Sequence, residues 1–180
     1  MRAGKEIKLT AGLLLAGFCA ALGSPASAIP IPGRTPYFVN DYAGALSMGV
    51  KQHLETSLAM LRFETPRKIE CVVSIFPSLD GKSWDEFLSE YIRNWRKEWP
   101  FERDNRVHFV VFVNERTAKI HVGYGVGRQF DDAAAEEIVN QLVSPELSQA
   151  RYDEGVKKGV EAVIKVFNGK KGKKEVRIVS

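Results

Sequence analysis

The stretch VHFVVFV at residues 107–113, followed by NER at 114–116 and TAKIHVGY at 117–124, decides the fold of this chain. The first segment is apolar apart from one histidine, which is typical of a strand buried on both faces. The last segment alternates apolar and polar residues, which is typical of a half-exposed strand. Because only a short polar turn separates them, the two segments predict an antiparallel hairpin around a central strand.

Polar residues lie at the open end of this hairpin, both before its first strand and after its second. Asp104 and Asn105 come just before the first strand, the glycine-rich segment 123–127 follows the second, and Asp131 and Asp132 open a helical pattern. The antiparallel register places Asn105 roughly opposite Gly125. We therefore expect these segments to meet at one end of the sheet and to form a small polar site.

The spacing of these residues alone does not decide the chemistry of the site. The carboxylates of Asp104, Asp131 and Asp132, with the amide oxygen of Asn105, are oxygen ligands of the kind that hard divalent cations such as Ca²⁺ bind. The same residues are also typical of a helix N-cap and of turns. A metal site and a purely structural role are both consistent with the pattern.

The rest of the chain predicts alternating helices and strands. Apolar residues at helical spacing indicate a helix from Ser47 to the Thr65-Pro66 step, and a strand follows at 69–76. A capping box, Ser83 with Glu86, opens a second helix that ends near residues 99–100. Further helices are expected over 131–145 and from about 152 to 168. This order predicts an α/β fold with a mixed sheet and helices on both faces.

Residues 1–28 have the pattern of a secretory signal peptide. A basic segment with Arg2, Lys5 and Lys8 precedes an apolar run at 13–22, and Ala26-Ser27-Ala28 resembles a cleavage site. We expect a mature chain that begins at Ile29 and is periplasmic or secreted. No later segment approaches the roughly 20 apolar residues of a membrane span, so we expect no transmembrane segment in the mature chain.

The positive charge of the chain is concentrated at its ends. Residues 1–28 carry three basic residues and one acidic one, so cleavage would lower the formal net charge from +4 to +2. Residues 169–180 carry five basic residues and one acidic one. A nucleic-acid-binding domain carries its positive charge on the folded part, so we expect no nucleic-acid partner. We expect the tail to be flexible, and its charge would also suit anionic lipid or another polyanion.

Several other kinds of site are not supported by the sequence. The histidines at 53, 108 and 121 have no zinc-like spacing, and the mature chain keeps one cysteine, Cys71, in an apolar run typical of a buried strand. The segment Gly123-x-Gly125-x-Gly127 has its third glycine one place early for a dinucleotide fingerprint, with Arg128 in the expected position. We expect neither zinc nor a nucleotide.

An ordered set of short motifs resembles the TPM domain family. These motifs are VNDYAGALS at 39–47, Trp95, Asp104-Asn105, GYG at 123–125, Asp132-Ala133 and RYDEG at 151–155. The resemblance covers residues 37–167, within a single domain expected at 29–168. It implies a compact α/β sandwich with a central sheet of about four strands.

The resemblance also implies a set of functional residues and two classes of function. It adds Asp41 to Asp104, Asn105, Asp131 and Asp132 as a ligand of Ca²⁺ or Mg²⁺. Some relatives are described as divalent-metal binders with weak acid phosphatase activity, and others as accessory factors of membrane complexes. Two positions depart from the family pattern: Arg106 replaces the usual glycine, and Val126-Gly127 replaces the frequent Leu-Glu.

Two functions remain as alternatives at this point. The first is an exported accessory or interaction module that binds a protein or membrane complex and holds a weakly bound cation. The second is a metal-dependent acid phosphatase. Because the expected site contains no histidine, serine or cysteine nucleophile, the sequence favours the first. A carboxylate nucleophile or a metal-bound water would be needed for the second.

Overall fold

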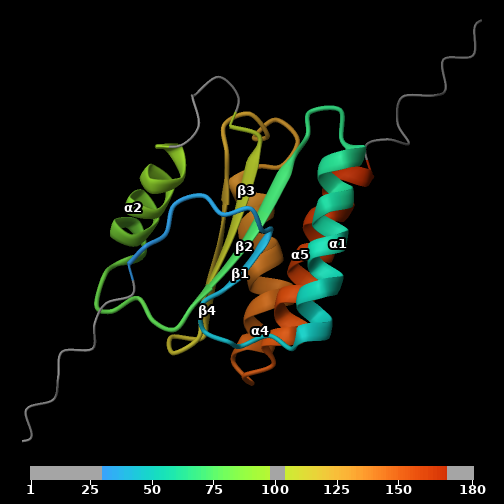
Figure 1. Cartoon of the computed structure of the whole chain (residues 1–180). Coiled ribbons are helices and arrows are strands. Elements are labelled where there is room, and N and C mark those ends of the chain that lie inside the picture. Colours follow the sequence, from blue (N-terminus) through green and yellow to red (C-terminus); the bar gives the residue numbers. More distant parts are fainter. Residues whose placement is uncertain (1–29, 98–103, 170–180) are drawn as a thin grey trace, which may run out of the picture.

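The computed structural model describes residues 30–97 and 104–169 of the 180-residue chain (Figure 1). The predicted signal peptide and the basic tail beyond Gly169 lie outside these residues. The described residues form a three-layer arrangement, with one helix on one face of a central sheet and a group of helices on the other. None of the described helices is long and apolar enough to cross a membrane.

The sheet has four strands in the order β1-β2-β3-β4. These are β1 (Val39–Asp41), β2 (Glu70–Phe76), β3 (Arg106–Phe112) and β4 (Thr117–Val122). The first three strands run parallel, and β4 returns antiparallel to β3 with Phe109 opposite Ile120. The predicted hairpin, the mixed sheet and the strand number are therefore confirmed.

Helices cover both faces of the sheet, as predicted (Figure 1). One face carries α2 (Trp84–Arg96). The other carries α1 (Met48–Glu64), α3 (Asp132–Ile138), a π-helical turn (Val139–Val143), α4 (Ser144–Leu147) and α5 (Tyr152–Asn168). The side-chain oxygen of Ser47 caps α1, and Ser83 and Glu86 form the expected capping box of α2.

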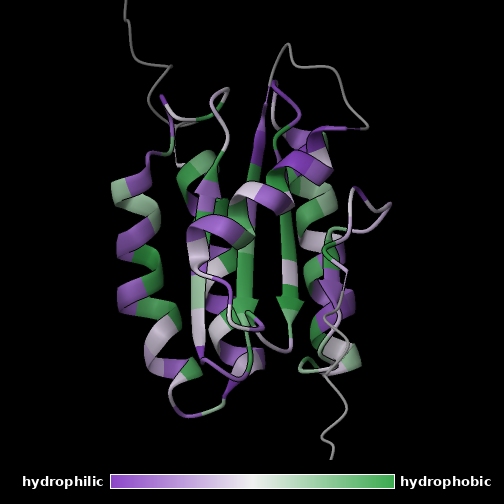
Figure 2. Ribbon diagram, turned by 90° about the vertical axis from the view of Figure 1, so that its left-hand side faces the viewer, coloured by the Kyte–Doolittle hydropathy of each residue, from purple (hydrophilic) through white to green (hydrophobic). Residues whose placement is uncertain are grey.

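The strand β3 is buried along its whole length because each of its faces packs on a different core. Phe109 and Val111 belong to the core under α1 and α5. Val110 and Phe112 belong to a smaller core under α2, which is rich in aromatic residues. Figure 2 shows the hydrophobic colouring along the strands between the helix layers. This two-sided burial explains the continuous apolar run of the sequence.

Two elements differ from the sequence-based expectation. The short edge strand β1 was not predicted, because three residues carry no readable alternation. The helix expected over 131–145 is interrupted by a π-helical turn at Val139–Val143, just before Pro145. Proline has no N–H and its ring collides with the carbonyl four residues earlier in a regular helix, and a widened turn accommodates it.

Candidate functional site

The segment before β3 meets the glycine loop after β4, as the hairpin register predicts. The N–H of Gly123 donates to the carbonyl of Arg106 at 2.8 Å, and the N–H of Gly125 donates to the carbonyl of Asp104 at 3.0 Å. Gly125 is therefore aligned with Asp104, one residue from the expected partner Asn105. The pairing extends the ladder past the ends of both strands and holds the loop against the Asp104-Asn105 step.

Two glycines of this loop are required by close contact. A Cβ at Gly123 would lie 2.5 Å from the carbonyl oxygen of Asp104, and a Cβ at Gly125 would lie 2.5 Å from Oδ1 of Asn105. At Gly127 the nearest atom would be 3.8 Å away, an ordinary contact. The Gly-Tyr-Gly and Asp-Asn motifs are thus two sides of one packing arrangement.

A third segment, the connection between α1 and β2, joins the same place. The amide nitrogen of Asn105 donates to the carbonyl of Arg67 at 2.8 Å. The guanidinium of Arg67 in turn donates to the carbonyl of Gly125 at 3.0 Å. The side chain of Asn105 therefore links two loops, and this use of its amide group is structural.

Asp104 has one oxygen that the fold leaves unsatisfied. Its Oδ2 lies 3.4 Å from the guanidinium of Arg96 at the end of α2. Its Oδ1 is buried and has no hydrogen-bond partner among the described residues, and the same holds for Nε2 of His121 on β4. Burial lowers the pKa of His121, and the nearby charges of Asp104 and Asp132 oppose this effect only in part, so the pKa of His121 stays below its ordinary value. Buried, unpaired polar atoms are costly and often mark a functional site.

The two aspartates before α3 have different roles. Oδ1 of Asp131 accepts a hydrogen bond from the N–H of Ala134 at 2.9 Å and so caps α3. Asp132, the first residue of the helix, is exposed. Its charge, like that of Asp104, raises the pKa of His121, and we call the surroundings of His121 the acidic neighbourhood.

Asp41 does not join this neighbourhood, which corrects the expectation from the resemblance. Its strand is parallel to β2 and Asp41 pairs with Ile75, whereas Asp104 precedes the residue that pairs with Glu70. The two aspartates therefore lie at opposite ends of the sheet. The Asp41 carboxylate accepts from the N–H groups of Ala45 and Leu46 and lies 2.9 Å from Nζ of Lys51. Burial raises the pKa of Asp41, but these hydrogen bonds outweigh it and the net pKa is lowered.

The remaining donors do not form a closed metal centre. Across residues 30–97 and 104–169, no group of three or more His, Cys, Asp or Glu side chains is placed to hold a metal ion. Calcium takes six to eight oxygen ligands in proteins. Of the five predicted ligands, Asp41 is distant and Asp131 is a cap, whereas Asn105 uses its amide nitrogen between loops and keeps its amide oxygen as a candidate ligand.

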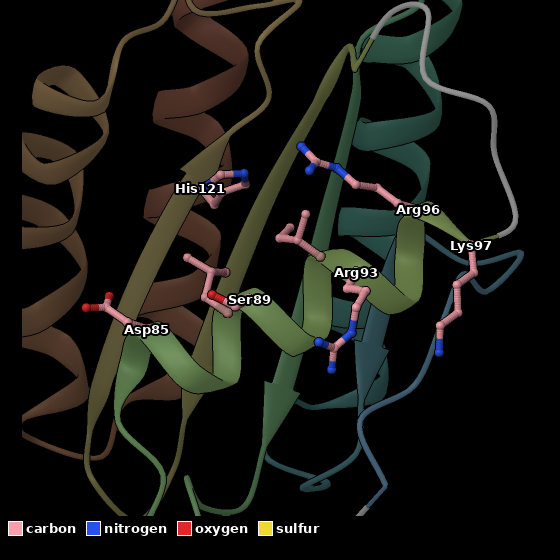
Figure 3. A pocket seen from close by; sticks show the side chains of 8 residues that line it. Asp85, Ser89, Arg93, Arg96, Lys97 and His121 are labelled. Atoms are coloured by element: carbon pink, nitrogen blue, oxygen red, sulfur yellow. The ribbon is translucent and has the colours of Figure 1, made fainter.

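A cleft of about 690 Å³ lies beside this site, along the side of α2 that faces β4. Leu88 and Ile92 give it an apolar wall, His121 stands on the β4 side, and cationic and polar groups complete it. The complete lining is Asp85, Leu88, Ser89, Ile92, Arg93, Arg96, Lys97 and His121. Figure 3 shows the Arg96 side chain extending back across the sheet from the end of α2, with His121 behind the helix.

The cleft was not predicted from the sequence. It exists because α2 covers β2 and β3 but leaves the same face of β4 open. A signal was present in the sequence, since Arg93, Arg96 and Lys97 gather in the last turn of an otherwise amphipathic helix. Such charges are also expected at any helix C-terminus, where they stabilise the helix dipole. The pattern alone therefore could not identify a site.

With this geometry in view, comparison with known proteins establishes the family. The chain belongs to the TPM domain family, whose sequence profile matches residues 39–166. This confirms the resemblance inferred from the motifs. A comparison with curated proteins finds no match.

Solved structures show the same fold. The N-terminal domain of a protein from P. gingivalis aligns with a TM-score of 0.67 at 25% identity, over 74% of this chain and 83% of that one. The N-terminal domain of the cg2496 protein from Corynebacterium glutamicum gives 0.56 at 16% identity, over 77% and 85%. The BA42 protein from Bizionia argentinensis gives 0.55 at 15% identity, over 69% and 82%.

Proposed function

We propose that this chain is an exported accessory protein, periplasmic or secreted, whose TPM domain binds a partner protein through the cleft between α2 and β4. The supporting observation is the composition of the cleft. An apolar wall from Leu88 and Ile92 runs into a cationic end with Arg93, Arg96 and Lys97. Concave sites with an apolar surface and a few convergent polar groups are typical binding sites.

The charge pattern suggests the chemistry of the bound segment. Arginine and lysine form their strongest hydrogen bonds with carboxylates and phosphates. A short acidic segment with one or two apolar side chains would place its carboxylates near Arg93 and Lys97 and its apolar groups on Leu88 and Ile92. Asp85, at the opposite end of α2, would disfavour a segment that is acidic along its whole length and would help to fix its direction.

The nucleophile chemistry of the described residues favours binding over catalysis. Cys71 is fully buried in β2, and burial raises the pKa of its thiol to about 12. A thiol with that pKa stays protonated at neutral pH and is not an effective nucleophile. Covalent catalysis through Cys71 is therefore not expected, which supports recognition as the proposed function.

Selection of peptides displayed on phage, against the mature chain, tests the proposal. We expect recovered peptides to combine Asp or Glu with apolar residues. Fluorescence anisotropy should then show at least tenfold weaker binding of a recovered peptide to the Arg93→Glu/Lys97→Glu variant. Met48→Ser, an exposed change at the start of α1, serves as the control and should leave binding unchanged. Recovery of no acidic peptide, or equal affinity for all three proteins, would refute the cleft as the binding site.

A metal-dependent acid phosphatase is the second candidate, and the unsatisfied Oδ1 of Asp104 is the observation that favours it. Asp104, Asn105 and Asp132 would hold Ca²⁺ or Mg²⁺ with water completing the shell, and the cation would supply Lewis-acid polarisation of a phosphate. So few protein ligands imply weak binding, with a dissociation constant of about 10⁻⁴–10⁻³ M. Arg96 would contact the substrate phosphate.

Hydrolysis of p-nitrophenyl phosphate by the mature chain distinguishes the two candidates. On the accessory proposal, activity with several millimolar Ca²⁺ or Mg²⁺ equals that with EDTA. A cation-dependent activity that EDTA abolishes, and that Asp104→Asn removes while the protein stays folded, would favour the phosphatase instead.

A further inference from the structure

Exposed apolar side chains gather at the end of the molecule that carries the glycine loop. Phe63, in the last turn of α1, is 80% exposed, and Tyr124, within the glycine loop, is 96% exposed. Met60, one turn before Phe63, is 54% exposed. The hydrogen bond from Arg67 to Gly125 joins the connection after α1 to the glycine loop. These side chains therefore belong to one surface rather than to scattered positions.

One cation lies over an exposed aromatic ring, and another follows the glycine loop in the sequence. Nζ of Lys68 lies 5.1 Å from the centroid of the Phe63 ring and donates to the Phe63 carbonyl at 2.9 Å. Arg128 is exposed one residue beyond the glycine loop. Two of the acidic groups nearby are neutralised by ion pairs, Glu70 with Arg62 and Arg106, and Asp104 with Arg96. Asp131 serves as a helix cap and Asp132 remains exposed beside it.

The chain leaves the described part at the same end. The ring of Phe167, in the last turn of α5, lies 6.0 Å from the ring of Phe130, which follows the glycine loop. Figure 1 shows α5 ending beside the end of α1. The eleven residues beyond Gly169 include Lys170, Lys171, Lys173, Lys174 and Arg177 and one acidic residue, Glu175. The last described residues therefore lie at the end of the molecule that carries the exposed aromatic side chains, and the sequence that follows them is strongly basic.

We propose that this end of the domain, defined by Phe63, Lys68, Tyr124 and Arg128, docks on an anionic lipid bilayer, and that the positive charge of the sequence after Gly169 adds to the attraction. Phe63 and Tyr124 enter the headgroup region, where aromatic side chains are favoured. Lys68 and Arg128 contact lipid phosphates, and the net positive charge of residues 170–180 strengthens the attraction to the anionic surface. One weak apolar anchor together with a basic segment gives stable but reversible binding.

The apolar side chains distinguish a bilayer from other anionic occupants. A soluble polyanion such as heparin or nucleic acid gains attraction from the cations but nothing from burying Met60 and Phe63. The side chain of Phe63 has no polar atom that could pair with a polyanion. It gains free energy only when an apolar surface removes it from water. A bilayer supplies negative charge and an apolar layer together.

Co-sedimentation of the mature chain, residues 29–180, with vesicles tests the proposal. We expect binding to vesicles of 30% phosphatidylglycerol in phosphatidylcholine, and at least tenfold less binding to pure phosphatidylcholine. The Phe63→Ser/Tyr124→Ser variant should bind the anionic vesicles at least fivefold less. The matched control is Met48→Ser, which removes an equally exposed apolar side chain (75% exposed) at the other end of α1 and should bind as the unaltered chain does.

The alternatives give different results. Deletion of 170–180 should weaken binding without abolishing the difference between the unaltered and the Phe63→Ser/Tyr124→Ser surface. If only the deletion matters, or if soluble heparin competes equally well for the unaltered and the double-substituted chain, the occupant is a polyanion and the proposal is wrong. No binding to anionic vesicles also overturns it. Thermal unfolding of each variant verifies that the fold is intact.

Discussion

Replacing Gly123 by alanine should destabilise the domain far more than the same change at Gly127, four residues away. At Gly123 the new Cβ would lie 2.5 Å from the Asp104 carbonyl oxygen and 2.8 Å from that of Arg106. These neighbours are backbone atoms, so no side-chain rotation relieves the clash. Moving the loop away would also lengthen the hydrogen bond from Gly123 to Arg106.

The magnitude follows from these two contributions. Overpacking in a tight site costs about 1–3 kcal/mol, and a weakened hydrogen bond adds about 0.5–1.5 kcal/mol. We therefore expect Gly123→Ala to lower the free energy of unfolding by about 2–4 kcal/mol, a fall of roughly 10 °C in Tm for a domain of this size. At Gly127, where the nearest atom is 3.8 Å away, the expected change stays within about 0.5 kcal/mol.

Urea unfolding followed by far-ultraviolet circular dichroism measures both variants against the unaltered mature chain. The slope of the unfolding free energy against urea should be the same for all three, which establishes that the midpoints report stability. The reasoning is refuted if the two variants differ by less than about 0.5 kcal/mol, since the packing of the loop on Asp104 would then not be as close as described.

Four further expectations test other parts of the molecule. Phe109→Ala should cost about 3–5 kcal/mol in urea unfolding, because Phe109 is fully buried in a strand packed on both faces; a loss below about 1 kcal/mol would contradict this. Because the pKa of Asp41 is lowered in the folded state, its stabilisation holds above its ordinary pKa and is lost as the pH falls through the folded value. Asp41→Asn should therefore be less stable than the unaltered chain at pH 7 and nearly equal to it at about pH 2, and an equal difference at both pH values would exclude the ion pair with Lys51 as the cause. Burial lowers the pKa of His108 from 6.5 to about 3. As the pH falls, the unfolded chain therefore takes up this proton before the folded chain does, and the free energy of unfolding should decrease as the pH falls from 6.5 to about 3. His108→Gln should reduce that slope by up to about 1.4 kcal/mol per pH unit, and an unchanged slope would place the titration elsewhere. The intact mass of exported protein should correspond to a chain that begins at Ile29, whereas a full-length mass would contradict cleavage.

The sequence predicted the hairpin and the starts of α1, α2, α3 and α5 because these depend on local signals, whereas the end expected for the second helix, near residues 99–100, lies outside the described residues. The two-sided burial of β3 appears as an unbroken apolar run, and the alternation of β4 marks its single buried face. The caps at Ser47 and Ser83 are read directly from residue type and spacing. On α2 the buried residues Phe87, Tyr91, Ile92 and Trp95 recur at helical spacing, so one face of the helix is apolar in the sequence itself.

The candidate site was predictable only where the chain folds back on itself. The hairpin register alone brings Asp104 to the glycine loop, since a turn of fixed length sets that alignment. The position of Asp41 depends instead on the direction of β1, which has only three residues and whose parallel pairing is decided by distant contacts. The cleft depends on which strands α2 leaves uncovered, and no local pattern encodes that. Both features needed the tertiary structure.

The two positions that depart from the family pattern explain why the acidic neighbourhood is sparse in this chain. Arg106, where a glycine is usual, is buried and lies 3.3 Å from Glu70, so it contributes to a buried ion-pair network. Val126, where the family often has leucine, is fully buried in the core, and Gly127 beside it supplies no carboxylate. Arg106 and Val126 thus serve the folded structure, and Gly127 stands where the family pattern often has a glutamate. Arg96, which pairs with Asp104 and also lines the cleft, then connects the remaining carboxylate to a cationic surface. An anionic segment bound in the cleft would compete with Asp104 for Arg96, so Asp104→Asn should strengthen the binding of an acidic peptide, whereas it would weaken a metal site. The direction of that one change separates the two proposed functions.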